Sequence, residues 1–259
     1  MNVAATGTID PMHQFQINPL VGNLDGTPFV FTNSALWMLI VLALIWLFML
    51  GGMKRQLVPG RWQVAVEGMT GFVESMVTTS IGPEGRKFLP WVFTVFMFFL
   101  FGNLLGVMPL ALVGVQPFTV TSQFTVTGVM SIMSFAIVLT VGFWRHKHRF
   151  FTLFIPHGTP ALLLPLIFLI ELLSFAVRPF SLGLRPFVAM IAGHILVEVF
   201  GNFVIQGINA GGAVGPAVSL LSFVFIVGVM SLELLVCAIQ AYVFALLTSL
   251  YINDAVNLH

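Results

Sequence analysis

The sequence predicts an all-α membrane protein, and two observations carry that prediction. Of its 259 residues, 58% are hydrophobic and only 7% are charged, whereas about 25% of residues are charged in an ordinary soluble domain. The longest apolar runs exceed the roughly 20 residues that a helix needs to cross a bilayer. Lipid offers no hydrogen bonds, so nearly every backbone amide must be paired within a helix. We expect five transmembrane helices plus an interfacial amphipathic helix, in a single membrane domain over residues 1–259.

The expected spans follow from the apolar runs and the loops between them. They are residues 35–52, 88–113, 124–144, 160–206 and 214–252. No Lys or Arg precedes the first run, whereas a signal peptide begins with a positively charged region. We therefore interpret the first run as a retained span.

The cations indicate how these spans are oriented. Eight of the ten Lys and Arg residues lie in two loops. With five spans, both loops face the same compartment, and cationic loops mark the cytoplasmic side. We therefore expect the N-terminus outside and the C-terminus inside. The cations are Lys54, Arg55, Arg61, Arg86 and Lys87 between the first two spans, and Arg145, Lys147 and Arg149 between the third and fourth.

Residues 61–81 predict an amphipathic helix at the inner membrane surface. It would serve as a surface anchor, or alternatively as a docking face for another subunit. Its polar face is Gln63, Glu67, Thr70 and Glu74, and its apolar face is Trp62, Val66, Met69, Val73, Met76 and Val77.

The fourth apolar run is too long for one upright helix. Residues 161–206 would form a continuous helix roughly 70 Å long, about twice a bilayer. The run is either two spans joined by a hairpin or one tilted or bent helix. We favour one bent helix, because the only good turn signal, residues 207–216, comes after it. Pro186 removes a helical hydrogen bond and crowds the carbonyl of Leu182, so we expect a kink or local unwinding near residues 183–186.

The polar residues inside the spans are the candidates for function. An ionisable group at mid-bilayer costs about 2.5–3.5 kcal/mol on insertion scales, so such groups line a pathway or pair with one another. Ion pairs that only hold helices together are the alternative. The candidates are Asn103, Glu171, Arg178, Ser181, Arg185, His194, Glu198, Glu233 and Gln240.

Spacing along the fourth span divides these candidates into groups. Glu171, Arg178 and Arg185 are seven residues apart, nearly two helical turns, so they share one stripe. We expect Arg178 to be an inner-side partner of Glu171. His194 lies about half a turn out of phase with Arg185 and is matched by Glu198, four residues further on.

The last two spans can be matched in depth if they form an antiparallel hairpin. Arg185 and Gln240 have their midpoint at residue 212.5, and His194 and Glu233 have theirs at 213.5, both in the expected turn. Arg185 should then face Gln240 in depth, and His194 should face Glu233 about 13 Å nearer the outside.

A carboxylate and an imidazole at one depth predict a proton relay, because His titrates near neutrality and a buried Glu can titrate in the same range. The guanidinium of Arg185 stays charged, so it attracts a carboxylate and repels a passing proton. This combination does not describe a simple pore. It predicts two half-paths separated by the charge of Arg185, so that another carrier must move the proton from one half-path to the other.

Several motifs resemble subunit a of the F-type ATP synthases, particularly its alphaproteobacterial and mitochondrial-type branch. They are RPFSLGLRPFVAMIAGH, LELLVCAIQAYVFALLTSLYINDA, DPMHQF, LVPGRWQ, FGNLLGVMP and FTVTSQFTVT. The resemblance covers nearly the whole chain. It implies a stator subunit whose two long, tilted, antiparallel helices pack against a rotor ring, each ring subunit carrying one buried carboxylate.

The resemblance also implies a role for each polar candidate. Arg185 resembles the essential arginine that faces the passing ring carboxylate, and Gln240 resembles its neighbour. His194, Glu233, Asn103 and Glu198 would line the outer half-channel, and Glu171, Ser181 and Arg178 the inner one. Pro186 stands where the family usually has Leu, and Ala189 stands where many relatives have Asn, so we give Ala189 no channel role.

The implied partners are a ring of c subunits, b-type peripheral stalk subunits, the remaining ATP synthase subunits, the lipid membrane and protons, but no nucleic acid. We expect a bacterial inner membrane, with a mitochondrial inner membrane as the alternative. We expect no cofactor and no metal. The chain contains no GxxxxGK[ST] phosphate loop, so ATP chemistry would occur on another subunit.

Three other functions were weighed. A secondary transporter also keeps charges beside helices broken by Gly and Pro, but the sequence has no internal repeat. A haem- or metal-bearing subunit needs converging ligands, and only His194 lies deep in a span, while His146 and His148 sit in a basic loop. A purely structural membrane subunit is the remaining alternative.

Overall fold

The computed structural model confirms the all-α membrane fold and adds one short sheet. It describes residues 19–21, 31–53, 58–108, 118–147, 150, 163–210 and 214–257. In the small sheet, β1 (Pro19–Val21) pairs antiparallel with β2 (Phe31–Thr32). The motif DPMHQF, the cations Lys54, Arg55 and Arg149, residue His148 and the expected span end at residues 109–113 lie outside the described residues.

Within the described residues, 5 helices are long and apolar enough to cross a membrane. They are α1 (Asn33–Gly52), α3 (Leu89–Val107), α4 (Phe124–His146), α5 (Leu164–Asn209) and α6 (Val214–Val256). Between them lie the amphipathic helix α2 (Arg61–Ile81) and two short 3₁₀ helices, η2 (Pro83–Lys87) and η4 (Val120–Ser122). The helices begin and end close to the expected boundaries, because long apolar runs flanked by polar loops define them well.

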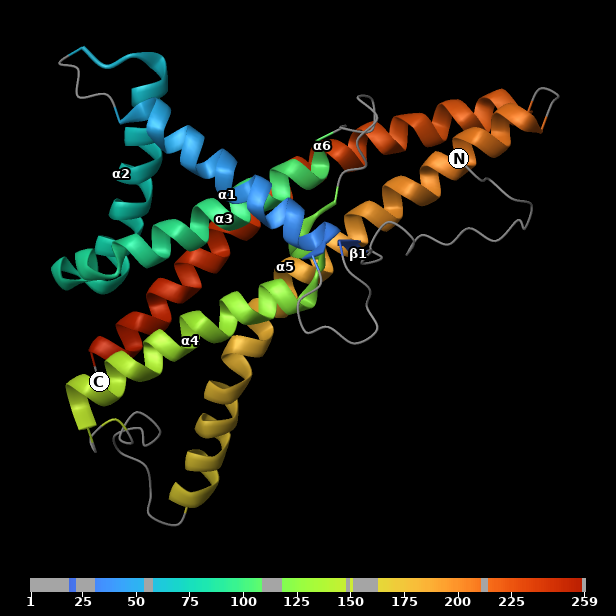
Figure 1. The fold of residues 1–259 in the computed structure, drawn as a ribbon. Helices are drawn as coiled ribbons and strands as arrows, with labels where there is room; N and C mark the ends of the chain where they lie inside the picture. The colour runs from blue at the N-terminus through green and yellow to red at the C-terminus, as the bar shows by residue number, and fades with distance from the viewer. Residues whose placement is uncertain are drawn as a thin grey trace.

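Helix α2 packs its apolar face against α1, α3 and α6, and in Figure 1 it runs across the direction of α3 and α4. Trp62 donates its ring N–H to the carbonyl oxygen of Phe48 over 2.9 Å. Val66, Val73 and Val77 are buried. Gln63, on the same helical face as Glu67, is buried as well. Its amide donates to Glu67 over 2.7 Å, which lets a polar side chain lie on the packed face.

Helix α3 forms the centre of the molecule. In its most apolar stretch 61% of the residues are buried, against 6% for α5 and 17% for α6. Phe99 of α3 stacks on Phe244 of α6 with 4.2 Å between ring centroids. The long helices α5 and α6 therefore expose much apolar surface that lipid or another protein must cover.

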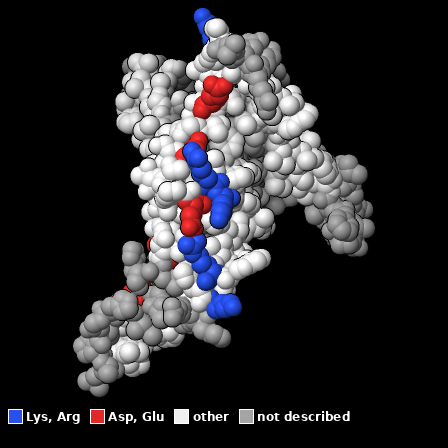
Figure 2. Space-filling view, turned by 90° about the vertical axis from the view of Figure 1, so that its left-hand side faces the viewer, with Lys and Arg blue, Asp and Glu red and all other residues white. Residues whose placement is uncertain are grey.

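Charged side chains gather along one edge of the molecule, where Figure 2 shows them as a column on an otherwise uncharged surface. Arg86 pairs with Glu74 over 2.9 Å, and Arg145 pairs with Glu84. The second pair joins the loop after α2 to the end of α4. The two cationic loops therefore lie at the same end of the molecule, as the sequence predicted. The hydrogen bond and the charge of Arg145 lower the pKa of the exposed Glu84 carboxyl.

The last helix ends at that same edge. The ring Nε2 of His146 donates to the carbonyl oxygen of Val256 over 3.1 Å. His146, which we expected to be solvated because it sits in a basic loop, is therefore half-buried against α6, since the end of α6 packs beside the end of α4.

Helix α5 is one helix, as predicted, and it continues through both Pro179 and Pro186. Figure 1 shows it as two arms that meet at an angle where it crosses α4. Of the kink or local unwinding that we expected near residues 183–186, the bend is observed and the unwinding is not. The crossing braces this section: Ser131 of α4 donates to the carbonyl oxygen of Pro179, and a Cβ on Gly183 would lie 3.2 Å from the Cα of Gly128.

The hairpin between α5 and α6 forms at the expected turn, and the two helices run side by side and antiparallel away from it (Figure 1). A Cβ on Gly207 would lie 2.7 Å from the carbonyl oxygen of Gly215, so only glycine allows the backbones to approach this closely. Ser219 donates to the carbonyl oxygen of Val204 over 2.9 Å, and Phe200 stacks on Phe225 with 5.2 Å between ring centroids.

Candidate functional site

His194 and Glu233 meet between α5 and α6, as depth matching predicted. The imidazole Nδ1 of His194 lies 3.0 Å from Oε1 of Glu233, and the two side chains are only 13% and 4% exposed. The prediction succeeded because the hairpin turn and the helical rise together fix which residues share a level.

A third segment completes this group of side chains. The hydroxyl of Thr119, just before η4, bonds to Nε2 of His194. The hydroxyl of Thr121 donates to the side-chain oxygen of Asn103 on α3. Asn103, Thr119, Thr121, His194 and Glu233 are called the His194 cluster below. In this cluster the side-chain nitrogen of Asn103 is buried and has no hydrogen-bond partner among the described residues, so it remains available to a water molecule.

A glycine sets the spacing between the helices at this level. A Cβ on Gly193 would lie 2.7 Å from Oε1 of Glu233. Real side-chain atoms do not approach so closely, so any larger residue would displace the carboxylate. Gly193 thus allows α5 and α6 to hold the histidine and the carboxylate together.

A groove of about 580 Å³ opens on the α5–α6 surface beside the cluster. Its walls are apolar and include small residues, and Glu233 is the one ionisable residue in its lining. The lining includes Ala189, Gly193, Leu196, Gly228, Leu232 and Glu233. The carboxylate of Glu233 therefore lies between the buried histidine and an open face of the hairpin.

Arg185 lies on α5 about two and a half turns before His194 and is exposed, whereas Gln240 on α6 is half-buried. None of the ion pairs formed within the described part of the chain involves Arg185. An exposed guanidinium in an apolar helix, without an ion-pair partner among the described residues, requires either water or another anion.

Toward the other end of the hairpin, Arg178 pairs with Asp254 near the end of α6 over 2.7 Å. Its guanidinium also lies over the rings of Phe175 and Tyr251, 5.4 and 5.1 Å from their centroids. The expectation that Glu171 would be its partner was therefore wrong. Arg178 and Asp254 are called the Arg178 pair below.

The bend in α5 explains why depth matching missed this pair. The midpoint of Arg178 and Asp254 is residue 216, whereas that of His194 and Glu233 is 213.5. Where α5 turns at its crossing with α4, it no longer runs parallel to the axis of α6, and the matched level shifts along α6.

The remaining candidates lie along the same two-armed helix. Glu171 is half-buried on the first arm. Ser181 donates to the carbonyl oxygen of Arg178 over 3.2 Å. Glu198 is half-buried one turn beyond His194. The structure therefore brings His194, Glu233 and Asn103 into one cluster, while Glu171 and Ser181 remain on the arm that carries Arg178.

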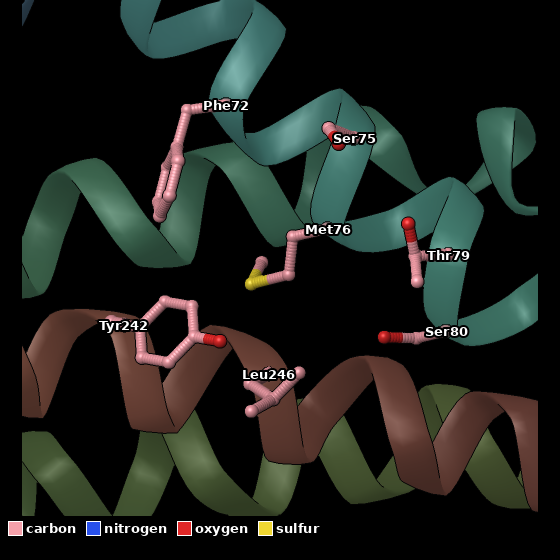
Figure 3. A pocket seen from close by; sticks show the side chains of 7 residues that line it. All are labelled: Phe72, Ser75, Met76, Thr79, Ser80, Tyr242 and Leu246. Atoms are coloured by element: carbon pink, nitrogen blue, oxygen red, sulfur yellow. The ribbon is translucent and has the colours of Figure 1, made fainter.

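A second cavity, of about 260 Å³, lies between α2 and α6. Figure 3 shows the hydroxyls of Tyr242 and Ser80 pointing into it from opposite helices. Its lining includes none of the candidate residues. It is lined by Phe72, Ser75, Met76, Thr79, Ser80, Tyr242 and Leu246.

Sequence reasoning missed Thr119, Thr121 and Asp254. The two threonines stand in the quoted motif FTVTSQFTVT, but nothing in their spacing shows that this segment folds back against α5. Asp254 is an acidic residue near the end of the last apolar run, and this position could have marked it as a partner for an arginine. Within the described residues, no group of three or more His, Cys, Asp and Glu side chains has the arrangement of a metal site.

The chain is similar to known proteins over nearly its whole length. The family described as ATP synthase A chain matches residues 35–253. The ATP synthase subunit a of Rhizorhabdus wittichii is 63% identical over 259 residues, covering 99% of each chain. The subunits a of Sphingopyxis alaskensis and Xanthobacter autotrophicus are 62% and 45% identical, covering 99% and 96% of this chain and 99% and 98% of theirs. The chain therefore belongs to the ATP synthase A chain family.

Proposed function

We propose that this chain is the stator subunit that carries protons to and from a ring of c subunits through two offset half-channels. Membership of its family makes it a membrane-sector component of a multi-subunit ATP synthase, in a bacterial inner membrane. The proposal adds how its residues couple proton flow to rotation and so to ATP synthesis elsewhere in the complex.

The observation that carries the proposal is the exposed Arg185, which has no ion-pair partner among the described residues. A permanent charge on an apolar helix is costly unless an anion faces it. A carboxylate on a neighbouring ring subunit supplies that anion. The small residues of the adjacent groove allow a helix from another subunit to come close to α5 and α6.

The His194 cluster supports the entry half of the path. The imidazole of His194 can accept and release a proton, and Glu233 joins it to the open groove. A proton that passes from His194 to Glu233 can then neutralise a ring carboxylate at the surface of the hairpin. The neutral carboxylic acid turns through lipid at far smaller cost than its charged form. Asn103 and Glu198 belong to the same half-path.

The arm of α5 that carries Glu171, Arg178 and Ser181 forms the exit half. When a protonated ring carboxylate returns to Arg185, the guanidinium favours its ionised form, and the proton leaves on this side. The fixed charge also repels a proton that would pass straight between the two halves, while Gln240 lies on the facing helix. A membrane potential supplies about 2.3 kcal/mol per charge per 100 mV to drive the cycle.

The charged edge of the molecule supports the orientation. Because cationic loops remain in the cytoplasm, the His194 cluster would face the outside, with the N-terminus there and the C-terminus inside. The chain would form a single membrane domain over residues 1–259, with b-type peripheral stalk subunits holding it against the ring.

The test is Arg185→Ala in the complete ATP synthase, reconstituted in vesicles. We expect ATP-driven proton pumping to be lost and passive proton leak to rise, while the complex still assembles. Arg145→Ala is the matched control, since it removes an exposed arginine outside the proposed path and should leave both rates unchanged. Normal coupled pumping by the Arg185→Ala complex would contradict the proposal.

A further inference from the structure

The hydroxyl of Thr119 contacts Nε2 of His194, whereas Glu233 lies beside the other ring nitrogen. Nδ1 of His194 lies 3.0 Å from Glu233, and Nε2 is bonded to Thr119. We propose that Thr119 is a positioning residue that keeps Nδ1 of His194 toward Glu233 through both protonation states of the ring. The inference rests on the proposed function, because it concerns how the entry half-path is held.

The chemistry of the ring makes the hydroxyl suitable for this role. A neutral imidazole donates from one nitrogen and accepts at the other. Beside an ionised Glu233, which only accepts, Nδ1 carries the proton, so Nε2 must accept from the Thr119 hydroxyl. When the ring gains a second proton at Nε2, the hydroxyl rotates and accepts instead. A single rotating O–H therefore satisfies both states, and the ring need not flip.

The backbone around Thr119 is built to hold it. The amide and the hydroxyl of Ser122 both donate to the carbonyl oxygen of Thr119, over 3.1 and 2.6 Å. Thr119 is 3% exposed. The neighbouring Thr121 is fixed by its bond to Asn103. The start of η4 is thus tied to itself and to α3, which holds the backbone of Thr119 beside the ring.

A glycine on α3 creates the space that Thr119 fills. A Cβ on Gly106 would lie 2.7 Å from both Cβ and Cγ2 of Thr119. One turn earlier, a Cβ on Gly102 would make only an ordinary contact, 3.5 Å from Cγ2 of Thr121. Position 106 therefore tolerates no side chain while Thr119 stays in place. Position 102 has room for the methyl group of alanine.

Few ionisable groups lie on the elements that pack around the ring. Those on α6 within one turn of this level are Glu233 and, one turn further on, the buried Cys237. The one on α5 within one turn of His194 is Glu198. Neither α3 nor η4 contains an Asp, Glu, Lys, Arg or His. On the side of α3 and η4, the group described in contact with the ring is therefore the neutral hydroxyl of Thr119.

The first test uses shape-matched variants in the complete, reconstituted ATP synthase. Thr119→Val keeps the branched shape but removes the hydroxyl, and we expect ATP-driven pumping to fall about fivefold, as for loss of one hydrogen bond. Thr119→Ser keeps the hydroxyl and should stay within about twofold of the wild type. An equal loss in both variants, or none in Thr119→Val, would overturn the inference.

The second test leaves every hydroxyl in place. Gly106→Ala should displace Thr119 and lower pumping as Thr119→Val does, whereas Gly102→Ala should not. If Thr119→Val fails to assemble, this glycine pair still decides the matter, because equal pumping by the two alanine variants contradicts the inference.

The third test reads the ring directly by solid-state NMR of the complex with ¹⁵N-labelled histidine. The His194 signals are assigned by their loss in His194→Gln. At alkaline pH we expect the neutral ring of the wild type to be protonated at Nδ1 alone. In Thr119→Val we expect a mixture of rings protonated at Nδ1 and rings protonated at Nε2. An unchanged spectrum in Thr119→Val would refute the positioning role.

The failure of this inference is distinguishable from failure of the proposed function. Glu233→Gln and His194→Ala are measured in the same vesicles. Normal pumping in both variants would contradict the proposed entry half-path through His194 and Glu233. Strong loss in both, with Thr119→Val unaffected, would remove only the role of Thr119.

Discussion

The His194 cluster and the Arg178 pair hold their charges in different surroundings. His194 and Glu233 are 13% and 4% exposed, and three separate segments of the chain enclose them. Arg178 and Asp254 are 29% and 36% exposed, and aromatic rings cover only part of the guanidinium. Arg185 lies between the two groups along α5 and is exposed on the hairpin surface.

This difference indicates different functions. Removing one partner of a buried charged pair leaves the other without compensation, which is costly, so a buried titratable pair is suited to passing a proton under control. A half-exposed pair is reached by water and contributes little to stability, so it is suited to an open exit. Variants of the two groups should therefore differ in how much proton pumping they lose.

The largest effect should come from Glu233→Gln, which keeps the shape of the side chain but cannot release a proton. We expect ATP-driven pumping to fall on the order of 100-fold, the usual loss when a positioned acid or base is removed. Proton uptake by reconstituted vesicles measures it. Glu84→Gln is the matched control at the charged edge, and comparable pumping by the two variants would abolish the contrast.

Gly193→Ala should come next, because the added methyl group would lie 2.7 Å from Oε1 of Glu233 and must push it away from His194. We expect a roughly tenfold loss of pumping, as displacement of a reacting group by about an ångström slows the transfer. Gly201→Ala on the same helix is the control, since a Cβ there meets nothing within 4 Å. If both glycines tolerate alanine equally, the close approach of the helices at Glu233 has no role.

The Arg178 pair should be less sensitive. We expect Asp254→Asn to lower pumping only a few-fold and to destabilise the complex by roughly 1 kcal/mol or less, the range for solvent-accessible ion pairs. A double-mutant cycle with Arg178→Ala, read from thermal unfolding of the purified complex, gives the coupling between the two side chains. A loss as large as that of Glu233→Gln would reverse our comparison.

The smallest effect belongs to Arg145→Ala at the charged edge. Arg145 lowers the pKa of Glu84 through its hydrogen bond and its charge. The stabilisation is therefore present above the unfolded-state pKa of Glu84 and is lost as pH falls through the lowered value. We expect wild-type pumping and a small decrease in thermal stability that disappears in acid. A decrease that grows as the pH falls would contradict the assigned cause.

The same contrast separates what the sequence could predict from what it could not. His194 and Glu233 were matched because both lie near the turn, on straight stretches of helix whose rise is fixed. Asp254 was missed because depth matching about the turn assumes two straight helices, whereas α5 bends where it crosses α4. Thr119 was missed because irregular segments such as the one before η4 carry no periodicity. A kink or local unwinding was expected near residues 183–186, and α5 bends where it crosses α4 without losing its helical structure.

The central claim is that Arg185 faces a carboxylate of the rotor ring, and a structure of the assembled ATP synthase tests it most directly. We predict that the ring packs on the groove beside Glu233, with one ring carboxylate within about 4 Å of the Arg185 guanidinium, the distance of an ion pair. A ring that packs elsewhere, with Arg185 facing lipid or a stalk helix, would contradict the account.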